Sequence, residues 1–143
     1  MASAEPTVEM PEQALVFALG ADDFCVGIEW VDEIVKPEEV SSVPDMPPMV
    51  EGVMDLRGKT TTIVDPKVTF GLPETDTDQQ VIIFDTDGET SVGWLVDYAY
   101  RVRDFEDPEL EAVEDNRYIE GILKDGDEFT LWVDPERVNG QLT

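Results

Sequence analysis

Carboxylates are the side chains that could carry most of the chemistry of this sequence. Its 143 residues include 34 Asp and Glu, nine Lys and Arg, one Cys and no His. Paired carboxylates can act as acid and base in glycoside hydrolysis, but pairs arise by chance among so many, and none lies in a recognisable motif. The absence of His removes the commonest general base and transition-metal ligand. The composition therefore argues against an enzyme.

A thiol and a metal loop are the other chemical possibilities. Cys25 lies between Phe24 and Val26 without a His to activate it, so we expect a packed small side chain and not a nucleophile. The stretches 76–78 (Asp-Thr-Asp) and 85–88 (Asp-Thr-Asp-Gly) lack the full spacing of a calcium loop and its later Glu. We therefore predict no metal site and no cofactor.

One stretch and its repeat organise the rest of the chain. Residues 51–66 and 120–135 both start with Glu-Gly, contain a turn with Gly in the middle, and end with Val-Asp-Pro. This pattern predicts a strand, a hairpin turn, a second strand and the start of a helix. The first copy carries Arg57 in its turn where the second carries Gly126. Since the turn does not need an arginine, we expect Arg57 to be an exposed contact residue, and a solvated turn residue is the alternative.

The remaining pattern predicts many short strands and few helices. Residues 1–12 are acidic and contain Pro, which predicts a disordered leader, whereas 72–79 predicts a linker and 104–116 a loop. Further elements are expected as strands over 13–19, 24–28, 80–84, 91–96 and 98–103, a helical turn and strand over 30–36, a hairpin turn at Asp87–Gly88, and a helix over 66–70 ended by Gly71. We predict an all-β protein of two similar barrels, about 13–72 and 79–140, which share one interface.

The formal net charge of -25 excludes several classes of partner. Nucleic acid and anionic membrane surfaces bind clustered Lys and Arg, which this chain lacks. No apolar run approaches the ~18 residues of a membrane span. The first dozen residues lack the basic and apolar regions of a signal peptide. We therefore expect a cytoplasmic protein that neither binds nucleic acid nor inserts into a membrane.

Six motifs follow one another between Gln13 and Asn139. They are Phe-Ala-Leu-Gly at 17–20, Val-Asp-Glu-Ile at 31–34, Pro-Asp-Met-Pro at 44–47, Gly-Val-Met-Asp-Leu-Arg-Gly at 52–58, Ile-Val-Asp-Pro at 63–66 and Val-Gly-Trp-Leu-Val-Asp at 92–97. In this order they resemble the CheW family of chemotaxis coupling proteins. Asp55 and Pro66 depart from the Asn and Leu usual in the family, which fits an acidic, well-capped variant. Many relatives also carry a longer C-terminal helix.

The resemblance implies one domain over 13–143, built as two intertwined five-stranded SH3-like β-barrels with short helices and exchanged strands. It implies a non-catalytic adaptor, without cofactors, that works in receptor arrays. The implied partners are the regulatory domain of the histidine kinase CheA and the cytoplasmic tips of chemoreceptors. The alternative is the coupling domain of a CheV-like protein or a CheA-type regulatory scaffold.

By the same resemblance, receptor contact falls on the groove between the barrels. The motif positions at or near this groove are Val31, Glu33, Gly52, Val53, Leu56 and Arg57. The positions tied to the coupling surface or its support are Val81, Gly93 and Gly121. Without the resemblance, the sequence pattern predicts an exposed position only for Arg57 and the 31–33 turn. The glycines have a strong structural alternative, because each can simply permit a bulge or close strand packing.

The charge also predicts that stability depends on salt. Repulsion among the carboxylates opposes the compact state in dilute salt, and in about 1 M salt the Debye length falls to roughly 3 Å. We infer a salt-rich cytoplasm, as in a halophilic archaeon; an ordinary acidic protein is the alternative. The melting temperature should therefore rise across a series of KCl concentrations, and a melting temperature that stays flat would contradict the inference.

Overall fold

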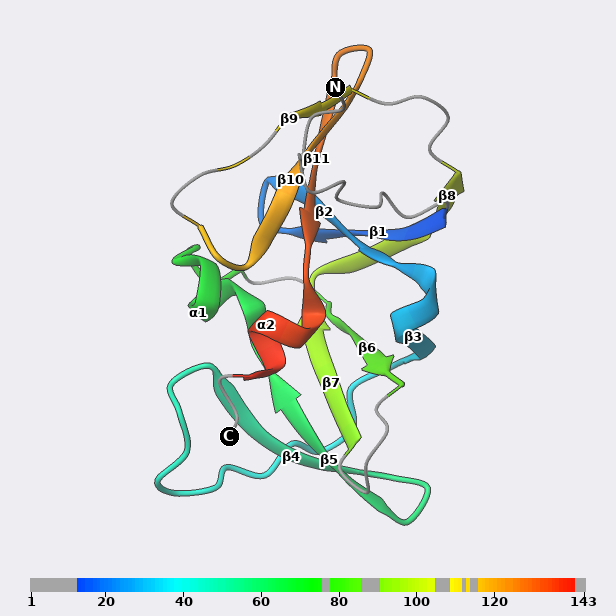
Figure 1. Cartoon of the computed structure of the whole chain (residues 1–143). Helices are drawn as coiled ribbons and strands as arrows, with labels where there is room; N and C mark the ends of the chain where they lie inside the picture. Colours follow the sequence, from blue (N-terminus) through cyan, green and yellow to red (C-terminus); the bar gives the residue numbers. More distant parts are fainter. Residues whose placement is uncertain are drawn as a thin grey trace, which may run out of the picture.

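The computed structural model describes residues 13–75, 78–85, 91–104, 109–111, 113 and 116–140. Most of the regular structure in them is β, in two sheets that lie one above the other in Figure 1. The all-β prediction is confirmed. The expected leader and the expected turn at Asp87–Gly88 lie outside the described residues.

The two sheets are named A and B here. Sheet A, the upper one in Figure 1, has the strand order β8 (Tyr98–Asp104), β1 (Gln13–Leu19), β2 (Asp22–Gly27), β11 (Glu128–Val133), β10 (Ile119–Asp125) and β9 (Glu109–Glu111). Sheet B has the order β3 (Val31–Val35), β6 (Gln80–Phe84), β7 (Ser91–Val96), β5 (Lys59–Val64) and β4 (Val50–Leu56). The short helical segments are η1 (Ile28–Trp30), α1 (Pro66–Phe70) and α2 (Pro135–Asn139).

Each sheet combines strands from both repeats. The β1–β2 hairpin precedes β3, β4 and β5 in the chain, yet it pairs with β8 and β11 of sheet A. The β6–β7 hairpin precedes β8 to β11, yet it pairs with β3 and β5 of sheet B. The pairs of β2 with β11 and of β7 with β5 are parallel, and the other pairs are antiparallel. The ranges 13–72 and 79–140 therefore each contribute strands to both sheets.

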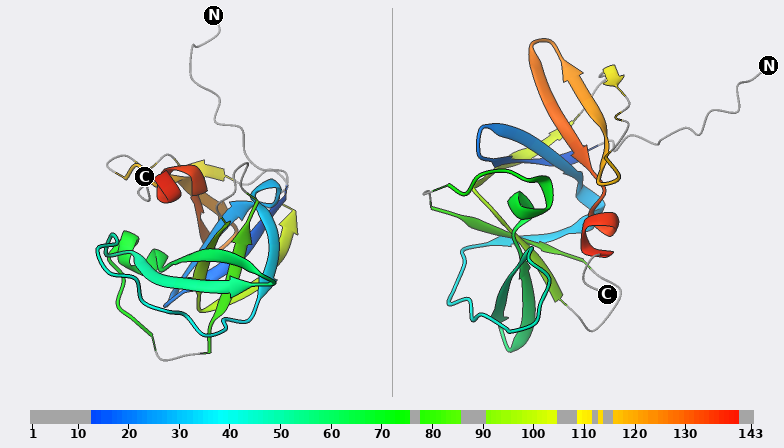
Figure 2. Two further views of the ribbon diagram at one scale, coloured as in Figure 1. Left: turned by 90° about the horizontal axis from the view of Figure 1, so that it is seen from below. Right: turned by 90° about the vertical axis from the view of Figure 1, so that its left-hand side faces the viewer.

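The turn between β4 and β5 is the two-residue turn that its sequence predicts. Arg57 and Gly58 have φ angles of 50° and 86°, and positive φ at both central residues is the mark of a type I′ turn. The left-handed conformation costs a non-glycine residue about 1 kcal/mol, so Arg57 occupies a position that a smaller residue would fill more easily. In the repeat, Gly126 takes this position with φ of 65°. The β4–β5 and β10–β11 hairpins project from opposite ends of the molecule (Figure 2).

Both short helices begin at an Asp-Pro pair, as predicted. The Asp65 carboxylate accepts a hydrogen bond from the Lys67 amide at 3.0 Å, and the Asp134 carboxylate accepts one from the Glu136 amide at 2.9 Å. Proline at the first helical position has no amide hydrogen to leave unpaired. Gly71 ends α1 with φ of 68°, the left-handed conformation of a helix C-cap, which confirms its predicted place.

A backbone bridge covers the edge strand β4 of sheet B. Ser41 pairs with Val53 of β4 through two backbone hydrogen bonds of 2.8 and 2.9 Å. Since β3 and β4 are the two edges of sheet B, the chain that leaves β3 returns to cover the edge of β4. Gly52 lies beside this bridge with φ of 154°, and a Cβ there would lie 2.1 Å from the Ser41 carbonyl oxygen. Only glycine fits this close approach.

Strand β9 takes the equivalent place in sheet A. It pairs with β10, and a Cβ on Gly121 would lie 3.0 Å from the Glu111 carbonyl oxygen and 2.6 Å from Leu110 Cδ1. The predicted loop over 104–116 is therefore wrong at β9, because a strand of three residues is too short to show an alternating pattern. This strand gives sheet A a sixth strand where five were predicted.

The largest part of the core lies between the two sheets. Its members include Leu15, Phe17, Phe24 and Val26 of sheet A and Ile82, Phe84, Trp94 and Val96 of sheet B. The Trp94 ring packs edge-on against Phe17, with centroids 6.1 Å apart. Two smaller clusters belong mainly to one sheet each, around Cys25 and Leu123 in sheet A and around Val81 and Ile63 in sheet B. The exchanged hairpins carry buried residues on both faces, so they contribute to all three clusters.

A buried charged residue ties helix α1 to sheet A. The Lys67 ammonium, which is fully buried, donates to an Asp97 carboxylate oxygen at 2.8 Å and to the Thr75 hydroxyl at 3.0 Å. The other Asp97 oxygen accepts from the Gly20 amide, in the turn between β1 and β2. Burial alone would raise the pKa of Asp97, but the hydrogen bonds that its carboxylate accepts from the Lys67 ammonium, the Thr75 hydroxyl and the Gly20 amide outweigh it and hold that pKa below its usual value.

Replacement of Gly52 by alanine tests the closure of sheet B. Gly52→Ala should lower the free energy of unfolding by about 3 kcal/mol, because the new Cβ would collide with the Ser41 carbonyl in a backbone conformation that suits glycine. Denaturant unfolding in concentrated salt measures this loss. Gly58→Ala is the control, since Gly58 also has positive φ but nothing lies within 4 Å of its Cβ position. Its loss should be only about 1 kcal/mol, and equal losses would contradict the account.

Candidate interaction surface

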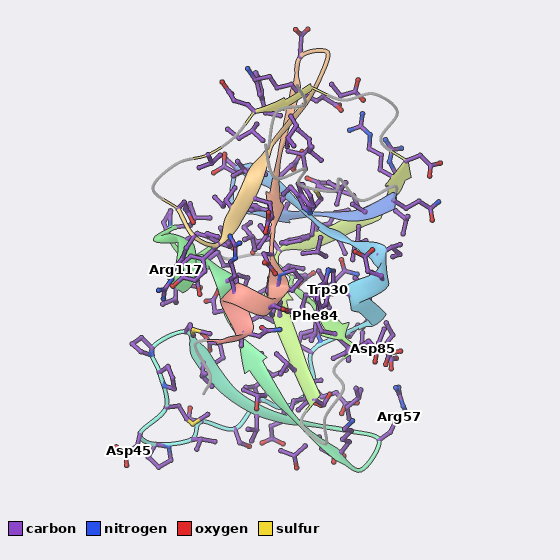
Figure 3. All side chains as sticks on the ribbon, in the orientation of Figure 1. Trp30, Asp45, Arg57, Phe84, Asp85 and Arg117 are labelled. Atoms are coloured by element: carbon purple, nitrogen blue, oxygen red, sulfur yellow. The ribbon has the colours of Figure 1, made fainter. Side chains whose placement is uncertain are left out.

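Arg57 and Glu33 form an exposed ion pair that joins the two edges of sheet B. Arg57 lies at the tip of the β4–β5 turn with its side chain 67% exposed, and Glu33 lies on β3 with its side chain 31% exposed. The guanidinium donates a hydrogen bond to the Glu33 carboxylate, and this bond raises the pKa of Arg57 above its usual value. The pair therefore fixes where the guanidinium stands on the surface. Figure 3 shows Arg57 at the outer edge of the molecule.

A hollow of about 250 Å³ lies beside this ion pair, and we call it the Arg57 hollow. Its lining residues are Asp32, Glu33, Leu56, Arg57, Lys59, Ile83, Phe84, Asp85 and Ser91. Carboxylates and cations stand around side chains from the apolar strand ends of β4 and β6, so the hollow offers both charged and apolar contacts. Of the residues predicted from the sequence, it brings together Glu33, Leu56 and Arg57.

Val31 and Val53 lie outside this hollow. Val31 is half-buried at the start of β3, where it pairs with Phe84 and packs against the central core. Val53 lines another hollow, of about 400 Å³, together with Glu38, Asp55 and its bridge partner Ser41. Both valines flank the Arg57 hollow on the strands that form it, without lining it.

Val81 and Gly93 are buried and do not line the Arg57 hollow. Val81 is fully buried within sheet B, and a Cβ on Gly93 would lie 2.6 Å from Val81 Cγ1 and 3.1 Å from Ile83 Cδ1. Since Ile83 lines the Arg57 hollow, a side chain at Gly93 would disturb the floor of the hollow. Gly52 likewise supports the edge of β4. Gly121 lies in sheet A, away from the other predicted residues, and supports the approach of β9 to β10.

Several lining residues of the hollow were not predicted from the sequence. Ile83, Phe84 and Asp85 come from the end of β6, which reaches the hollow because β6 pairs with β3 of the other repeat. That pairing has no local signal in the sequence. Lys59 and Asp32 could have been found, because each is a sequence neighbour of a predicted contact residue or turn.

The described residues contain neither a reactive thiol nor a cluster of metal ligands. Cys25 is fully buried, and burial raises the pKa of its thiol to about 12, so it is the packed side chain that the sequence predicts. No group of acidic or Cys side chains in the ranges described above could hold a metal ion. None of the helices described there is long and apolar enough to cross a bilayer.

The fold and the surface together define a class of protein. Two strand-exchanged sheets present a hollow with charged and apolar contacts at one edge of sheet B. These are properties of a protein that binds other proteins.

Comparison with known proteins gives the family. A family model described as the CheW-like domain matches residues 13–141. The chain is 31% identical over 121 residues to the chemotaxis protein CheW of Bacillus subtilis, across 84% of this chain and 74% of that protein. It is 26% identical to CheW of Klebsiella aerogenes, across 89% of this chain and 81% of that protein. The chain belongs to the CheW family.

A solved structure supports the same conclusion. The crystal structure of the scaffolding protein TtCheW from Thermoanaerobacter tengcongensis matches this chain with a TM-score of 0.76 and 26% identity, across 87% of this chain and 90% of the other. Family membership and this likeness confirm the predicted SH3-like fold class and the predicted non-catalytic role in chemotaxis coupling. The halophilic source stays a prediction.

The burial of Cys25 predicts that its thiol is inert in the folded protein. A thiol reagent such as iodoacetamide should modify Cys25 only in denaturant, because the buried thiol is protonated at neutral pH and out of reach. Mass spectrometry of the protein, with and without denaturant, measures this directly. Rapid modification under folding conditions would show that the core around Cys25 opens.

Proposed function

We propose that this protein couples the cytoplasmic tips of chemoreceptors to the histidine kinase CheA within receptor arrays. Membership of the CheW family supports this function. The main support for receptor binding is the Arg57 hollow, where three motif residues of the family meet on one surface. A protein that couples two partners needs a separate surface for each, so that both partners can bind at the same time.

We assign the Arg57 hollow to the receptor. The tip of a chemoreceptor is a helical hairpin, and a helix commonly lays its apolar face into a groove. Leu56 and Ile83 would receive that apolar face. The planar guanidinium of Arg57 would bind a carboxylate or the free carbonyls at a helix end. An exposed ion pair contributes little to stability, so Arg57 can exchange Glu33 for a receptor group at small cost to the fold.

The flanking and buried motif residues have supporting roles in this proposal. Val31 and Val53 would extend the contact along β3 and β4 on either side of the hollow. Val81 and Gly93 would hold Ile83 in place, and Gly52 would hold the edge of β4 against Ser41. Gly121 would shape sheet A through β9. Substitutions at the buried positions should thus act through the shape of the surface.

The regulatory domain of CheA is the second proposed partner. That domain has the same kind of barrels by family resemblance, so we assign it to a barrel end at which equivalent barrels can pack. The two projecting hairpins, β4–β5 and β10–β11, mark the two ends (Figure 2). A coupling domain of a CheV-like protein or a CheA-type regulatory scaffold is the second candidate function, because it would share the same fold and surfaces. We place the protein in the cytoplasm, at the receptor array.

Replacement of Arg57 by alanine tests the receptor surface. Arg57→Ala should weaken binding to a receptor cytoplasmic fragment by roughly tenfold or more, while the melting temperature changes little because the side chain is exposed. Isothermal titration in salt that keeps the protein folded measures the affinity.

Arg117→Ala is the matched control for this experiment. Arg117 is also exposed, and Figure 3 places it on the opposite side of the molecule from Arg57. Its replacement should leave receptor affinity unchanged. If Arg57→Ala binds the receptor fragment as tightly as the unmodified protein does, Arg57 does not belong to the receptor site.

A further inference from the structure

Sheet A carries a hollow at the position equivalent to the Arg57 hollow. It has a volume of about 500 Å³, lies along the edge strand β8, and we call it the Arg101 hollow. The strand pairings make the equivalence explicit: Glu33 pairs with Ile83 in sheet B, and Arg101 pairs with Val16 in sheet A. Ile83 lines the first hollow and Val16 lines the second. Arg101 therefore stands where Glu33 stands.

The charges of the two hollows are reversed at equivalent positions. Arg101 replaces Glu33, and Glu128 replaces Lys59 at the start of the second hairpin strand. In sheet B the carboxylate of Glu33 is neutralised by Arg57. The residue equivalent to Arg57 is Gly126, which has no side chain to offer. The exchange of charge thus leaves Arg101 without the intramolecular counterpart that Glu33 has.

Arg101 is unusual in a chain so rich in carboxylates. The sequence has 34 Asp and Glu against nine Lys and Arg. The neighbouring Arg103 forms ion pairs with both Asp125 and Glu128. Arg101 is exposed and lines the hollow, yet none of the residues that the structure describes forms an ion pair with it. Asp23 and Glu128 also line the hollow, but neither forms an ion pair with Arg101, so its guanidinium can receive a carboxylate from outside.

Two exposed tyrosines stand at the same hollow. The pairing of β8 with β1 skips Tyr100, and such a bulge redirects a side chain. Tyr98 and Tyr100 are two residues apart and therefore lie on the same face of β8, edge to face with ring centroids 5.0 Å apart, and they are 53% and 49% exposed. The bulge brings Arg101 to this face too, because its partner Val16 and the Tyr98 partner Ala18 lie on one face of β1. Tyrosine and arginine are the residue types that most often dominate the energy of protein interfaces. An exposed pair of aromatic rings beside an arginine is therefore typical of an interaction surface.

We propose that the Arg101 hollow is a docking site for an acidic segment of a partner protein, with a carboxylate on Arg101 and an apolar side chain on the Tyr98–Tyr100 pair. Arg101 selects an acidic occupant, because its planar guanidinium matches a carboxylate. Arg103 also lines the hollow, but it already pairs with Asp125 and Glu128, so Arg101 is the residue that would bind the carboxylate. The net charge of -25 makes nucleic acid a poor occupant. The hollow lies on the other sheet from the proposed receptor surface, so this inference does not rest on the receptor assignment.

A labelled peptide tests the proposal with the full chain. The probe is a short acetylated peptide of alternating Glu and Leu that carries fluorescein, and the matched probe has Lys in place of Glu. Fluorescence anisotropy is measured at the lowest salt concentration at which each variant melts like the unmodified protein. The Glu peptide should bind saturably. Arg101→Glu should weaken its binding at least tenfold and should strengthen binding of the Lys peptide. Arg117→Glu makes the same change of charge elsewhere. It should leave the ratio of the affinities for the Glu peptide and the Lys peptide unchanged.

Three results would overturn the proposal. The first is that the unmodified chain does not bind the Glu peptide. The second is that Arg101→Glu and Arg117→Glu weaken binding equally, since the effect would then be one of net charge. The third is that sedimentation equilibrium finds a dimer for the unmodified chain and a monomer for Arg101→Glu, since a second copy would then occupy the hollow.

Discussion

The exchange of the β1–β2 and β6–β7 hairpins is the constraint on which the rest of this structure depends. Each hairpin pairs with strands of the other repeat, through the parallel pairs of β2 with β11 and of β7 with β5. A unit of about half this chain could bury only a small core alone. With the exchange, the hairpins supply both the central core around Trp94 and Phe17 and the two smaller clusters. The positions of all surface sites are thereby fixed relative to one another.

The two halves of the duplicated architecture share their design but differ in the surfaces that they present. Gly52 and Gly121 solve the same problem, because each lets a crossing backbone approach its hairpin. The hollows beside these hairpins have diverged in charge. Glu33 is neutralised within the chain by Arg57, whereas Arg101, at the equivalent position, forms no ion pair in the part of the chain that the structure describes. A duplicated fold can in this way present two surfaces of different specificity on one rigid body.

Local features of the fold could be predicted from neighbouring residues alone, and long-range ones could not. The turn at Arg57 and the helix caps at Asp65 and Asp134 were predicted correctly, because each is determined by neighbouring residues. Strand exchange was expected only from the family resemblance, and the bridge to Ser41 and strand β9 were not predicted, because all three depend on contacts between distant segments. The same holds for the candidate site. The sequence indicated Arg57 and Glu33 separately, and family resemblance placed them in one region. Their ion pair and the contribution of β6 to the hollow could be found only from the structure.

Simultaneous binding of two partners is the central claim, and one measurement tests it most directly. The full chain is mixed with a CheA regulatory domain and a receptor cytoplasmic fragment from the same source, in salt that keeps all three folded. Sedimentation velocity then measures which complexes form. The account predicts one complex that contains all three proteins, because the two partners use different surfaces of a rigid body. Displacement of one partner by the other, or binding of neither by the folded chain, would contradict it.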